Sequence, residues 1–469
     1  MRMKLKAVTR IILAMALANM LTTALDFTYA TDELPIRNVI TGLHYGTIQD
    51  AIDASETLDG HTIQVEAGIY YERLTMNKSL KLIGEDRSTT IIDGGGSGTV
   101  INIRANDVDI SGFTLRNSGP DFDDKGVNLD HSSHTIIRGN IIINNTWGIW
   151  LGDATANSIT EDIIQNSTFS GIYLGDSTNN LIGHNTMANA AHGIWLERSD
   201  NNAIMENLVT ENGLGISLAV DSNNNTVVSN VITNNDEAIH LFSSSNNINE
   251  NTLTSNFYGI FSLHSGGNTI YRNNFIENVR QTSLDASYVD IWDNGFEGNY
   301  WGNYEGKDSN HDGIGDSTYE VYANNIDRYP LMGVFHSFNN SLGYNVNVIS
   351  NSTIERLEYF ETNDTIRIRL SQENTVDSVP TVEFCRVCIH HQLMDPDNII
   401  VVIDDNHTAV LHPNYNLYDN TTHRWIYFAY QHPVHKADIV PEFPSLNSLP
   451  LFMMATLLVI IICRRKTRS

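Results

Sequence analysis

Short runs of aliphatic residues, separated by polar turns, recur through the middle of the chain with a period near 22 residues. The clearest copies are Gly148-Ile-Trp-Leu151, Gly171-Ile-Tyr-Leu174 and Gly193-Ile-Trp-Leu196. Looser copies begin at Gly126, Gly215, Ala238 and Gly259, so successive copies start 22, 23, 22, 22, 23 and 21 residues apart. This pattern predicts a parallel β-helix in which each repeat forms one coil and equivalent residues stack about 4.8 Å apart.

A second column of the repeat holds an amide residue flanked by aliphatic side chains three positions before it and two positions after it. An Asn between inward aliphatics would be buried, and leaving its amide unpaired would be costly. Stacking removes this problem because each amide can bond to its equivalents above and below. We therefore expect an internal ladder that fixes the register, formed by Asn140, Asn185, Asn207, Asn230, Asn251 and Asn273.

The segments around the repeat complete an all-β fold. Residues 47–55 have the pattern of a short amphipathic helix with Thr47 at its N-cap, which would cover the open end of the stack. Coils from about residue 60 to 300 give about eleven turns of ~22 residues. The period is lost after residue 335, where short strands alternate with polar turns. We therefore predict a parallel β-helix with an N-terminal helical cap over 31–335 and a small β-sandwich or stalk domain over 336–440.

The two ends of the chain have the composition of export and anchoring segments. Residues 1–30 combine a basic start, an apolar stretch and the small-residue site Thr28-Tyr-Ala30, which is typical of a secretory signal peptide. Residues 441–469 contain an apolar run that ends at Cys463 and is followed by a basic tail. This arrangement predicts a single transmembrane helix with a cytoplasmic tail, which places the rest of the chain on the extracellular face.

Charge and composition narrow the possible partners. The formal net charge is −27, which argues against nucleic acid and favours solvent, cations or sugars. Asn accounts for 54 of the 469 residues, and sequons such as Asn77-Lys-Ser permit glycosylation. Cys385 and Cys388 are the only thiols outside the apolar tail, so the fold is no disulfide scaffold. We expect both thiols to lie in a buried strand, with a metal site near His390 as the alternative.

The residue between the two inward aliphatics of each coil should point outward. This outward column contains the candidate carbohydrate-binding residues Trp150, Tyr173, Trp195, His240 and Phe261. Aromatic faces stack on the apolar faces of sugar rings, and flanking carboxylates accept hydroxyl hydrogen bonds. The alternative is an aromatic ladder that only stabilises the sheet. The neighbouring carboxylates Asp153, Asp176 and Glu197 are weak catalytic candidates, because any β-helix with outward acids offers similar spacings.

A further motif with metal-ligand spacing follows the repeats. Asp308-Ser-Asn-His-Asp-Gly-Ile-Gly-Asp316 supplies the candidate ligands Asp308, Asn310, Asp312, the carbonyl of Ile314, and Asp316. Hard oxygen ligands spaced around a Gly turn favour Ca²⁺. Position 12 of the loop is Tyr319 where an EF-hand has Glu. A polar capping turn is therefore the alternative to a calcium site.

Several motifs resemble those of a known group of proteins. They are Thr47-Ile-Gln-Asp-Ala-Ile52, Gly112-Phe-Thr-Leu-Arg-Asn-Ser118, the coil motif, Gly298-Asn-Tyr-Trp-Gly-Asn-Tyr304 and Asp327-Arg-Tyr-Pro-Leu-Met332. Together they resemble right-handed parallel β-helix proteins of the NosD and carbohydrate-binding and sugar-hydrolysis (CASH) type. Val440-Pro-Glu-Phe-Pro444 resembles the Pro-Glu-Phe sorting signals of archaeal surface proteins. The resemblance implies a right-handed solenoid in a surface setting.

Other β-helix families match less well. The opening of the chain also resembles pectin methylesterases, but their catalytic contexts are absent, as are the motifs of polygalacturonases and pectate lyases. NosD proteins serve the maturation of copper enzymes, yet no Met/His cluster here argues for copper. We therefore expect a membrane-anchored surface protein that binds polysaccharide or an envelope glycan without catalysis. The alternatives are a polysaccharide lyase, hydrolase or epimerase using the outward carboxylates, and a structural or adhesive envelope protein.

Overall fold

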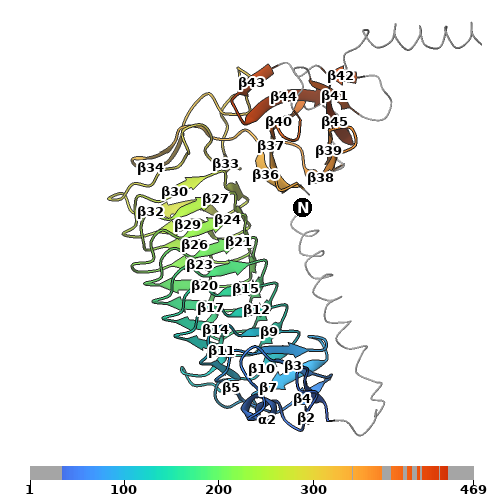
Figure 1. Cartoon of the computed structure of the whole chain (residues 1–469). Helices are drawn as coiled ribbons and strands as arrows, with labels where there is room; N and C mark the ends of the chain where they lie inside the picture. The colour runs from blue at the N-terminus through green and yellow to red at the C-terminus, as the bar shows by residue number, and fades with distance from the viewer. Residues whose placement is uncertain are drawn as a thin grey trace, which may run out of the picture. The chain divides into compact units, whose positions relative to one another are not determined.

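The computed structural model describes residues 34–340, 342–371, 382–394, 399–403, 409–411, 415–431 and 434–441. The chain divides into two compact units (Figure 1). Unit 1 comprises the described residues up to 270 together with 275–291 and 322–324, and unit 2 comprises 271–274, 292–321 and the described residues from 325 onward. The predicted signal peptide and the apolar run before Cys463 lie outside the described residues. Within those residues, no helix is long and apolar enough to cross a membrane.

Unit 1 is a parallel β-helix built from three sheets. A typical coil consists of β15 (Ser158–Thr160), β16 (Ile163–Gln165) and β17 (Ser170–Gly175). Each strand pairs in parallel with its equivalent in the next coil, as β15 does with β18 (Leu181–Gly183). The sheets that contain β15, β16 and β17 are called sheets A, B and C and hold 12, 11 and 10 strands. The prediction of about eleven coils is therefore confirmed.

The repeated Gly of the coil motif is explained by close contact between coils. A Cβ atom on Gly148 would lie 2.3 Å from the carbonyl oxygen of Gly171, and one on Gly193 would lie 2.6 Å from that of Gly215. Real Cβ atoms do not approach backbone oxygens so closely, so Gly148 and Gly193 could not be replaced without a backbone shift, although the equivalent residue 238 is Ala. The aliphatics that follow are fully buried in register, as at Ile149 and Ile172. The motif thus combines a tight backbone approach with a continuous aliphatic core.

The inward asparagines form a hydrogen-bonded ladder. The side-chain oxygen of Asn207 accepts from the backbone N–H and the Nδ2 of Asn185 at 3.0 and 3.1 Å. Its own Nδ2 donates to the carbonyl of Ile182 and to Oδ1 of Asn230, each at 2.9 Å. The same pattern links the predicted positions Asn140, Asn185, Asn207, Asn230 and Asn251, while Asn273 bonds to Asn299 within unit 2.

The structure contains two further Asn ladders that the sequence analysis did not single out. One runs along the turn before sheet A and comprises Asn157, Asn180, Asn202, Asn225, Asn246 and Asn268. The other contains Asn212, Asn235, Asn256 and Asn278. A shorter serine ladder links Ser177, Ser199 and Ser222 through backbone N–H groups and hydroxyl oxygens at 3.0 and 3.3 Å. Most of the inner turns therefore hold a buried polar side chain that is paired with its neighbour.

The open end of the helix begins with the predicted cap. Helix α2 spans Ile48–Asp53, and the Thr47 hydroxyl accepts a hydrogen bond from the backbone N–H of Asp50 at 3.1 Å. Ile48 and Ile52 are fully buried. The cap prediction is confirmed, and the structured helix is shorter than the segment 47–55.

Unit 2 contains two antiparallel sheets of five strands. The first has the order β36 (Val334–Asn339), β37 (Asn345–Ser350), β40 (Val382–His390), β44 (His423–Gln431) and β43 (Tyr415–Asp419). The second has the order β38 (Ile354–Phe360), β39 (Thr365–Leu370), β45 (Lys436–Pro441), β41 (Ile399–Ile403) and β42 (Ala409–Leu411). Val348 and Val387 of the first sheet and Ile366 and Ile439 of the second share one buried core. Cys385 and Cys388 are free thiols buried in β40, as the sequence predicts.

We expect Asn207→Ala to lower the free energy of unfolding by about 2–4 kcal/mol. It removes the acceptor of the Asn185 backbone N–H and Nδ2, and it removes the donor to the Ile182 carbonyl and to Oδ1 of Asn230. Urea unfolding measures the change. Asn324→Ala is the control, since Asn324 is exposed and makes no hydrogen bond within the part of the chain that the structure describes. Equal stability of the two variants would contradict a structural role for the ladder.

One rung of the ladder is a carboxylate. Asp162 is 1% exposed, and its Oδ1 accepts from the backbone N–H and Nδ2 of Asn140 at 2.7 and 3.0 Å. Its Oδ2 is buried without a partner among the described residues. Burial raises the pKa of Asp162 to about 7, against the opposing effect of the two hydrogen bonds from Asn140.

Because the folded-state pKa of Asp162 lies above its unfolded value, its ionisation destabilises the fold as pH rises from about 4 to about 7. Asp162→Asn removes this pH-dependent loss of stability, because an amide does not ionise. It also supplies the side-chain N–H donor that the Asn rungs have. We expect the variant and the wild type to be close in stability at pH 4, and the variant to be more stable by about 2–4 kcal/mol at pH 8. Urea unfolding across this pH range tests the expectation. A stability difference that does not change with pH would contradict it.

Candidate functional site

The outward face of sheet C carries the predicted aromatic column. Its strands are β14 (Trp147–Gly152), β17, β20 (His192–Glu197), β23 (Leu214–Leu218), β26 (Glu237–Leu241) and β29 (Tyr258–Ser262). The register places Trp150, Tyr173, Trp195, Ser217, His240 and Phe261 directly above one another. A second outward column, three residues earlier in each coil, contains Trp147, Ser170, His192, Leu214, Glu237 and Tyr258. The two columns together define the face.

Seven rings of this face form the aromatic cluster, which we define as Phe122, Trp147, Trp150, Phe169, Tyr173, His192 and Trp195. The Trp150 and Tyr173 rings have centroids 4.1 Å apart, and the Tyr173 and Trp195 rings 5.1 Å apart. Trp147 contacts Phe122 at 5.2 Å and Phe169 at 5.0 Å. Contacts of this kind stabilise each ring pair beyond simple burial. The cluster is therefore a preformed, rigid surface.

Exposure within the aromatic cluster is uneven, and this corrects one sequence-based expectation. Tyr173 is only 6% exposed and Trp147 only 1%. Because coils stack closely, the rings above and below Tyr173 cover its faces, so this ring cannot stack on a sugar. Trp150 and Trp195 are half-buried, and Phe122 is 58% exposed. The accessible aromatic surface thus comes from Trp150, Trp195, Phe122 and Phe169, the last of which is 37% exposed.

The remaining two predicted aromatic residues form a separate pair. His240 and Phe261 stack with centroids 5.5 Å apart, and Nδ1 of His240 lies 2.7 Å from a Glu237 oxygen. Ser217, between Trp195 and His240, has a small side chain and interrupts the column. The outward column is therefore two aromatic segments and not one continuous strip.

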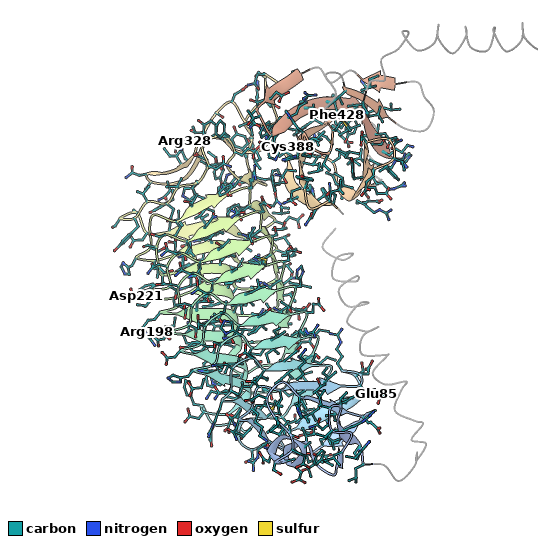
Figure 2. The ribbon with its side chains drawn as sticks, viewed as in Figure 1. Glu85, Arg198, Asp221, Arg328, Cys388 and Phe428 are labelled. Atoms are coloured by element: carbon teal, nitrogen blue, oxygen red, sulfur yellow. The ribbon has the colours of Figure 1, made fainter. Side chains whose placement is uncertain are left out.

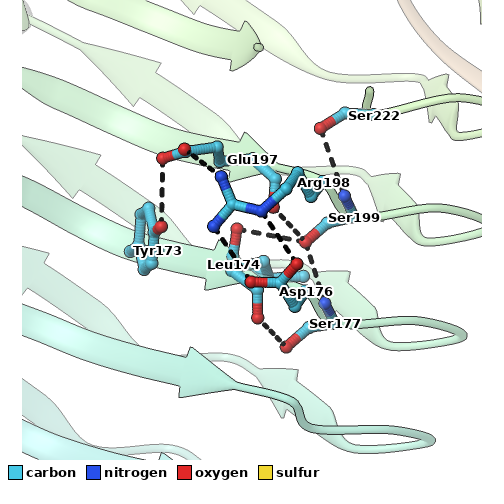
Figure 3. Close-up of polar contacts among 9 residues, drawn as sticks. Tyr173, Leu174, Asp176, Ser177, Glu197, Arg198, Ser199 and Ser222 are labelled. Atoms are coloured by element: carbon cyan, nitrogen blue, oxygen red, sulfur yellow. Dashed lines mark hydrogen bonds and ion pairs between the residues drawn. The ribbon is translucent and has the colours of Figure 1, made fainter. Parts of the chain in front are cut away.

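Arg198 joins two of the three candidate carboxylates (Figure 3). Its guanidinium pairs with both oxygens of Asp176 at 2.8 and 2.9 Å and also pairs with Glu197. The Tyr173 hydroxyl donates to Glu197 at 3.2 Å. Hydrogen bonding from Arg198 lowers the pKa of Asp176, which makes it a weaker base. These carboxylates are engaged, whereas Asp153 lies only near the imidazole of His131, at 3.6 Å.

Two basic groups complete the face. The ammonium of Lys125 lies 4.9 Å from the centroid of a Trp150 ring, and burial lowers the pKa of this lysine. Burial also lowers the pKa of His192 to about 4, so its imidazole is neutral at physiological pH.

Figure 2 shows Arg198 and Asp221 on the same edge of the solenoid. The face therefore combines stacked rings with a mixed charged edge.

Sequence reasoning missed Phe122, Trp147, Phe169, His192 and Arg198. Trp147 and His192 each stand one position before the repeated Gly, so a second column could have been recognised from the same period. Phe122 and Phe169 lie outside the strands, and no spacing pointed to them. Arg198 follows Glu197 in the turn, where the other coils show no repeated basic residue.

The predicted calcium loop is folded as a self-bonded turn. Asp308 accepts from the backbone N–H groups of Asp312 and Gly313 at 3.0 and 2.9 Å. Asp312 accepts from Ile314 N–H at 2.8 Å, and Asp316 from Ser309 N–H at 2.9 Å. Across the described ranges, no group of three or more His, Cys, Asp or Glu side chains is placed to hold a metal ion. Calcium binding by this loop stays a prediction.

Comparison with known proteins identifies related sequences. The model of a family described as "Periplasmic copper-binding protein (NosD)" matches residues 50–241 and 218–306. Copper favours imidazole, thiolate and thioether ligands. In the described part of the chain no group of three or more His, Cys, Asp or Glu side chains is placed to hold a metal ion, and burial raises the pKa of Cys385 to about 11. The described residues therefore do not fit a copper site, and no chemistry is assigned to one.

Individual relatives match shorter stretches. A cell surface glycoprotein of Methanothermus fervidus is 32% identical over 137 residues, which is 29% of this chain and 18% of the relative. A probable ABC transporter binding protein NosD of Stutzerimonas stutzeri is 38% identical over 84 residues, which is 17% of this chain and 19% of the relative. The chain thus spans less than a fifth of either curated relative.

Some solved structures resemble this chain at low identity. The A-module of the Azotobacter vinelandii mannuronan C-5 epimerase AlgE6 has a TM-score of 0.45 and 14% identity, over 52% of this chain and 74% of that one. An alginate lyase from Paenibacillus sp. FPU-7 has a TM-score of 0.42 and 15% identity, over 51% and 94%. The family match is the stronger finding, because its two segments together span residues 50–306, more than half of the 469 residues. The chain belongs to the NosD family.

Proposed function

We propose that this protein is a cell-surface β-helix protein that binds polysaccharide on sheet C without cleaving it. The aromatic cluster carries this proposal, because half-buried Trp150 and Trp195 rings on a rigid stack offer flat apolar surfaces to successive sugar rings. The matches to a cell surface glycoprotein and to the NosD family support the surface location. The apolar run before Cys463 would serve as the membrane anchor.

The electrostatics of the edge favour binding over catalysis. A catalytic carboxylate must be free to take or give a proton, whereas Asp176 and Glu197 are held by Arg198. The same ion pairs keep the carboxylates oriented, so they can accept hydrogen bonds from sugar hydroxyls. Asp153 is the candidate left for an enzyme, as a lyase, hydrolase or epimerase. A purely structural envelope protein is the third possibility.

A glycan array probed with the full-length chain in mild detergent tests the proposal. We expect binding to extended glycans that weakens at least tenfold in Trp150→Ala and in Trp195→Ala, because each loses a stacking surface. Tyr71→Ala is the matched control, since Tyr71 is 73% exposed and outside the aromatic cluster. Urea unfolding of each variant separates lost binding from lost folding.

The array also distinguishes the alternatives. The glycans are also assayed for new reducing ends and unsaturated products. If such products form with the wild type and disappear in Asp153→Asn, the protein is an enzyme and the binding proposal is wrong. Absence of binding to every glycan would leave the structural role.

We also propose that the loop 308–316 binds Ca²⁺. Gly313 has a φ of +77° and allows the tight turn that carries the candidate ligands. Binding would require Asp308 and Asp312 to exchange backbone hydrogen bonds for the ion. We expect 1 mM Ca²⁺ to raise the melting temperature by several degrees, EDTA to reverse the rise, and Asp316→Asn to abolish it. A melting temperature unaffected by Ca²⁺ and EDTA would refute the site and leave a capping turn.

A further inference from the structure

Unit 2 contains a pocket of about 660 Å³, a volume within the range of small-ligand sites. Its lining includes Arg272, Asn294, Phe296, Arg386, Asn420 and Trp425, all of which belong to unit 2. None of these six residues is among the candidate site residues that the sequence predicts. Asp312, from the predicted calcium loop, also lines the pocket.

A buried charge cluster forms part of the pocket lining. Nε of Arg272 donates to one oxygen of Glu297 at 2.6 Å, and Arg386 pairs with the other oxygen. Burial alone would raise the pKa of Glu297, but the Arg386 and Arg272 guanidiniums hold it below its usual value. Both Glu297 oxygens are thus occupied. Arg386 has five N–H donors, and only one of its nitrogens bonds to Glu297.

The wall of the pocket includes a rigid turn that exposes an aromatic ring. Oδ1 of Asn294 accepts from the backbone N–H groups of Phe296 and Glu297, both at 2.9 Å. Asp293 accepts from Gly295 N–H at 3.0 Å and pairs with Arg328. Phe296 is nevertheless 73% exposed. A large apolar side chain held out on a fixed turn beside a pocket has the character of a ligand anchor.

The polar groups of the pocket are mainly donors. The side-chain oxygens of Asn294 and Asn420 already accept hydrogen bonds from backbone N–H groups of their turns. For Asn420 the donors are the N–H groups of Thr422 at 2.8 Å and His423 at 2.7 Å. The Nδ2 groups of the two asparagines make no hydrogen bond within the described ranges, so both amides retain donors. Glu297 and Asp312 are the acidic exceptions. Glu297 is paired with two guanidiniums, and the Asp312 oxygens accept from Ile314 N–H at 2.8 Å and from Asn310 Nδ2 at 3.0 Å. Such a pocket suits a ligand that presents acceptors.

We propose that this pocket binds a sugar that carries a carboxylate, namely a uronic acid residue of a glycan. The carboxylate would accept from Arg386 and the two asparagine amides, and the C–H face of the ring would pack on Phe296. The pocket volume exceeds what a carboxylate group alone needs, so it leaves room for the sugar ring. This inference does not rest on the function proposed for sheet C, because its residues lie in the other unit.

The experiment is an NMR or calorimetric titration of the full-length chain in mild detergent. D-glucuronate and D-galacturonate are the probes, and D-glucose and D-galactose are the neutral sugars of the same shape. We expect at least one uronate to bind at least tenfold more tightly than its neutral counterpart. Equal affinity for acid and neutral sugar, or no uronate binding at tens of millimolar, would overturn the proposal.

Substitutions that keep the turns intact sharpen the test. Asn294→Asp and Asn420→Asp retain the oxygen that caps each turn but replace the donor amide with an acceptor. We expect each to weaken uronate binding at least tenfold, because a donor is lost and the two carboxylates repel. Phe296→Ala should weaken it several-fold. Asn303→Asp is the matched control, since it adds the same charge, retains the oxygen that accepts from Tyr319 at 3.1 Å, and lies outside the pocket lining.

The outcomes remain separate from those of the sheet C proposal. Trp150→Ala and Trp195→Ala should leave uronate binding unchanged. Unchanged affinity in Asn294→Asp and Asn420→Asp would show that the uronate binds elsewhere and would overturn the assignment.

Discussion

The stacking of coils at the spacing of β-strands governs the rest of this structure. Each buried side chain has the equivalent side chain of the next coil as its nearest neighbour above and below. The interior must therefore consist of residues that can pack against, or bond to, copies of themselves. Aliphatic side chains do so by packing. An amide does so by chemistry, because it carries a donor and an acceptor and can bond in series with copies of itself. An ionised carboxylate has no donor and cannot bond in series with its neighbours. Asp162 is the rung of the ladder where one side-chain oxygen has no partner among the described residues.

The same spacing determines what an outward column of aromatic residues becomes. Rings on successive coils are too close to remain independent, so they pack on one another and the middle ring loses its accessible faces. This is why Tyr173 is buried while Trp150 and Trp195, above and below it, remain partly open. A solenoid face therefore presents aromatic surface at the ends and margins of a cluster.

Periodic features could be predicted from the sequence, and non-periodic ones could not. The coil length, the inward aliphatics and the ladder through Asn207 all follow from a repeat of about 22 residues. The ladder through Asn202 repeats just as regularly, two residues before the aliphatic column through Ile204, but mostly Ser stands three residues before it, so it has an aliphatic flank on one side only. Tyr173 was placed on the correct face, yet its burial depends on Trp147 and on neighbouring coils. The Arg386–Glu297 pair joins positions 89 residues apart, and no spacing could have revealed it.

The scarcity of basic residues adds a further constraint. With 28 Lys and Arg against 55 Asp and Glu, at least 27 carboxylates have no Lys or Arg of their own to pair with, so a basic group near a binding surface has a specific effect. On sheet C, Arg198 is neutralised by Asp176 and Glu197, so the edge offers acceptors and suits the hydroxyls of uncharged sugars. In unit 2, Glu297 is shared by two guanidiniums and the asparagine oxygens are occupied, so the pocket offers donors. One acidic chain can thus present two surfaces of opposite hydrogen-bonding character, which is what the two proposed binding sites require.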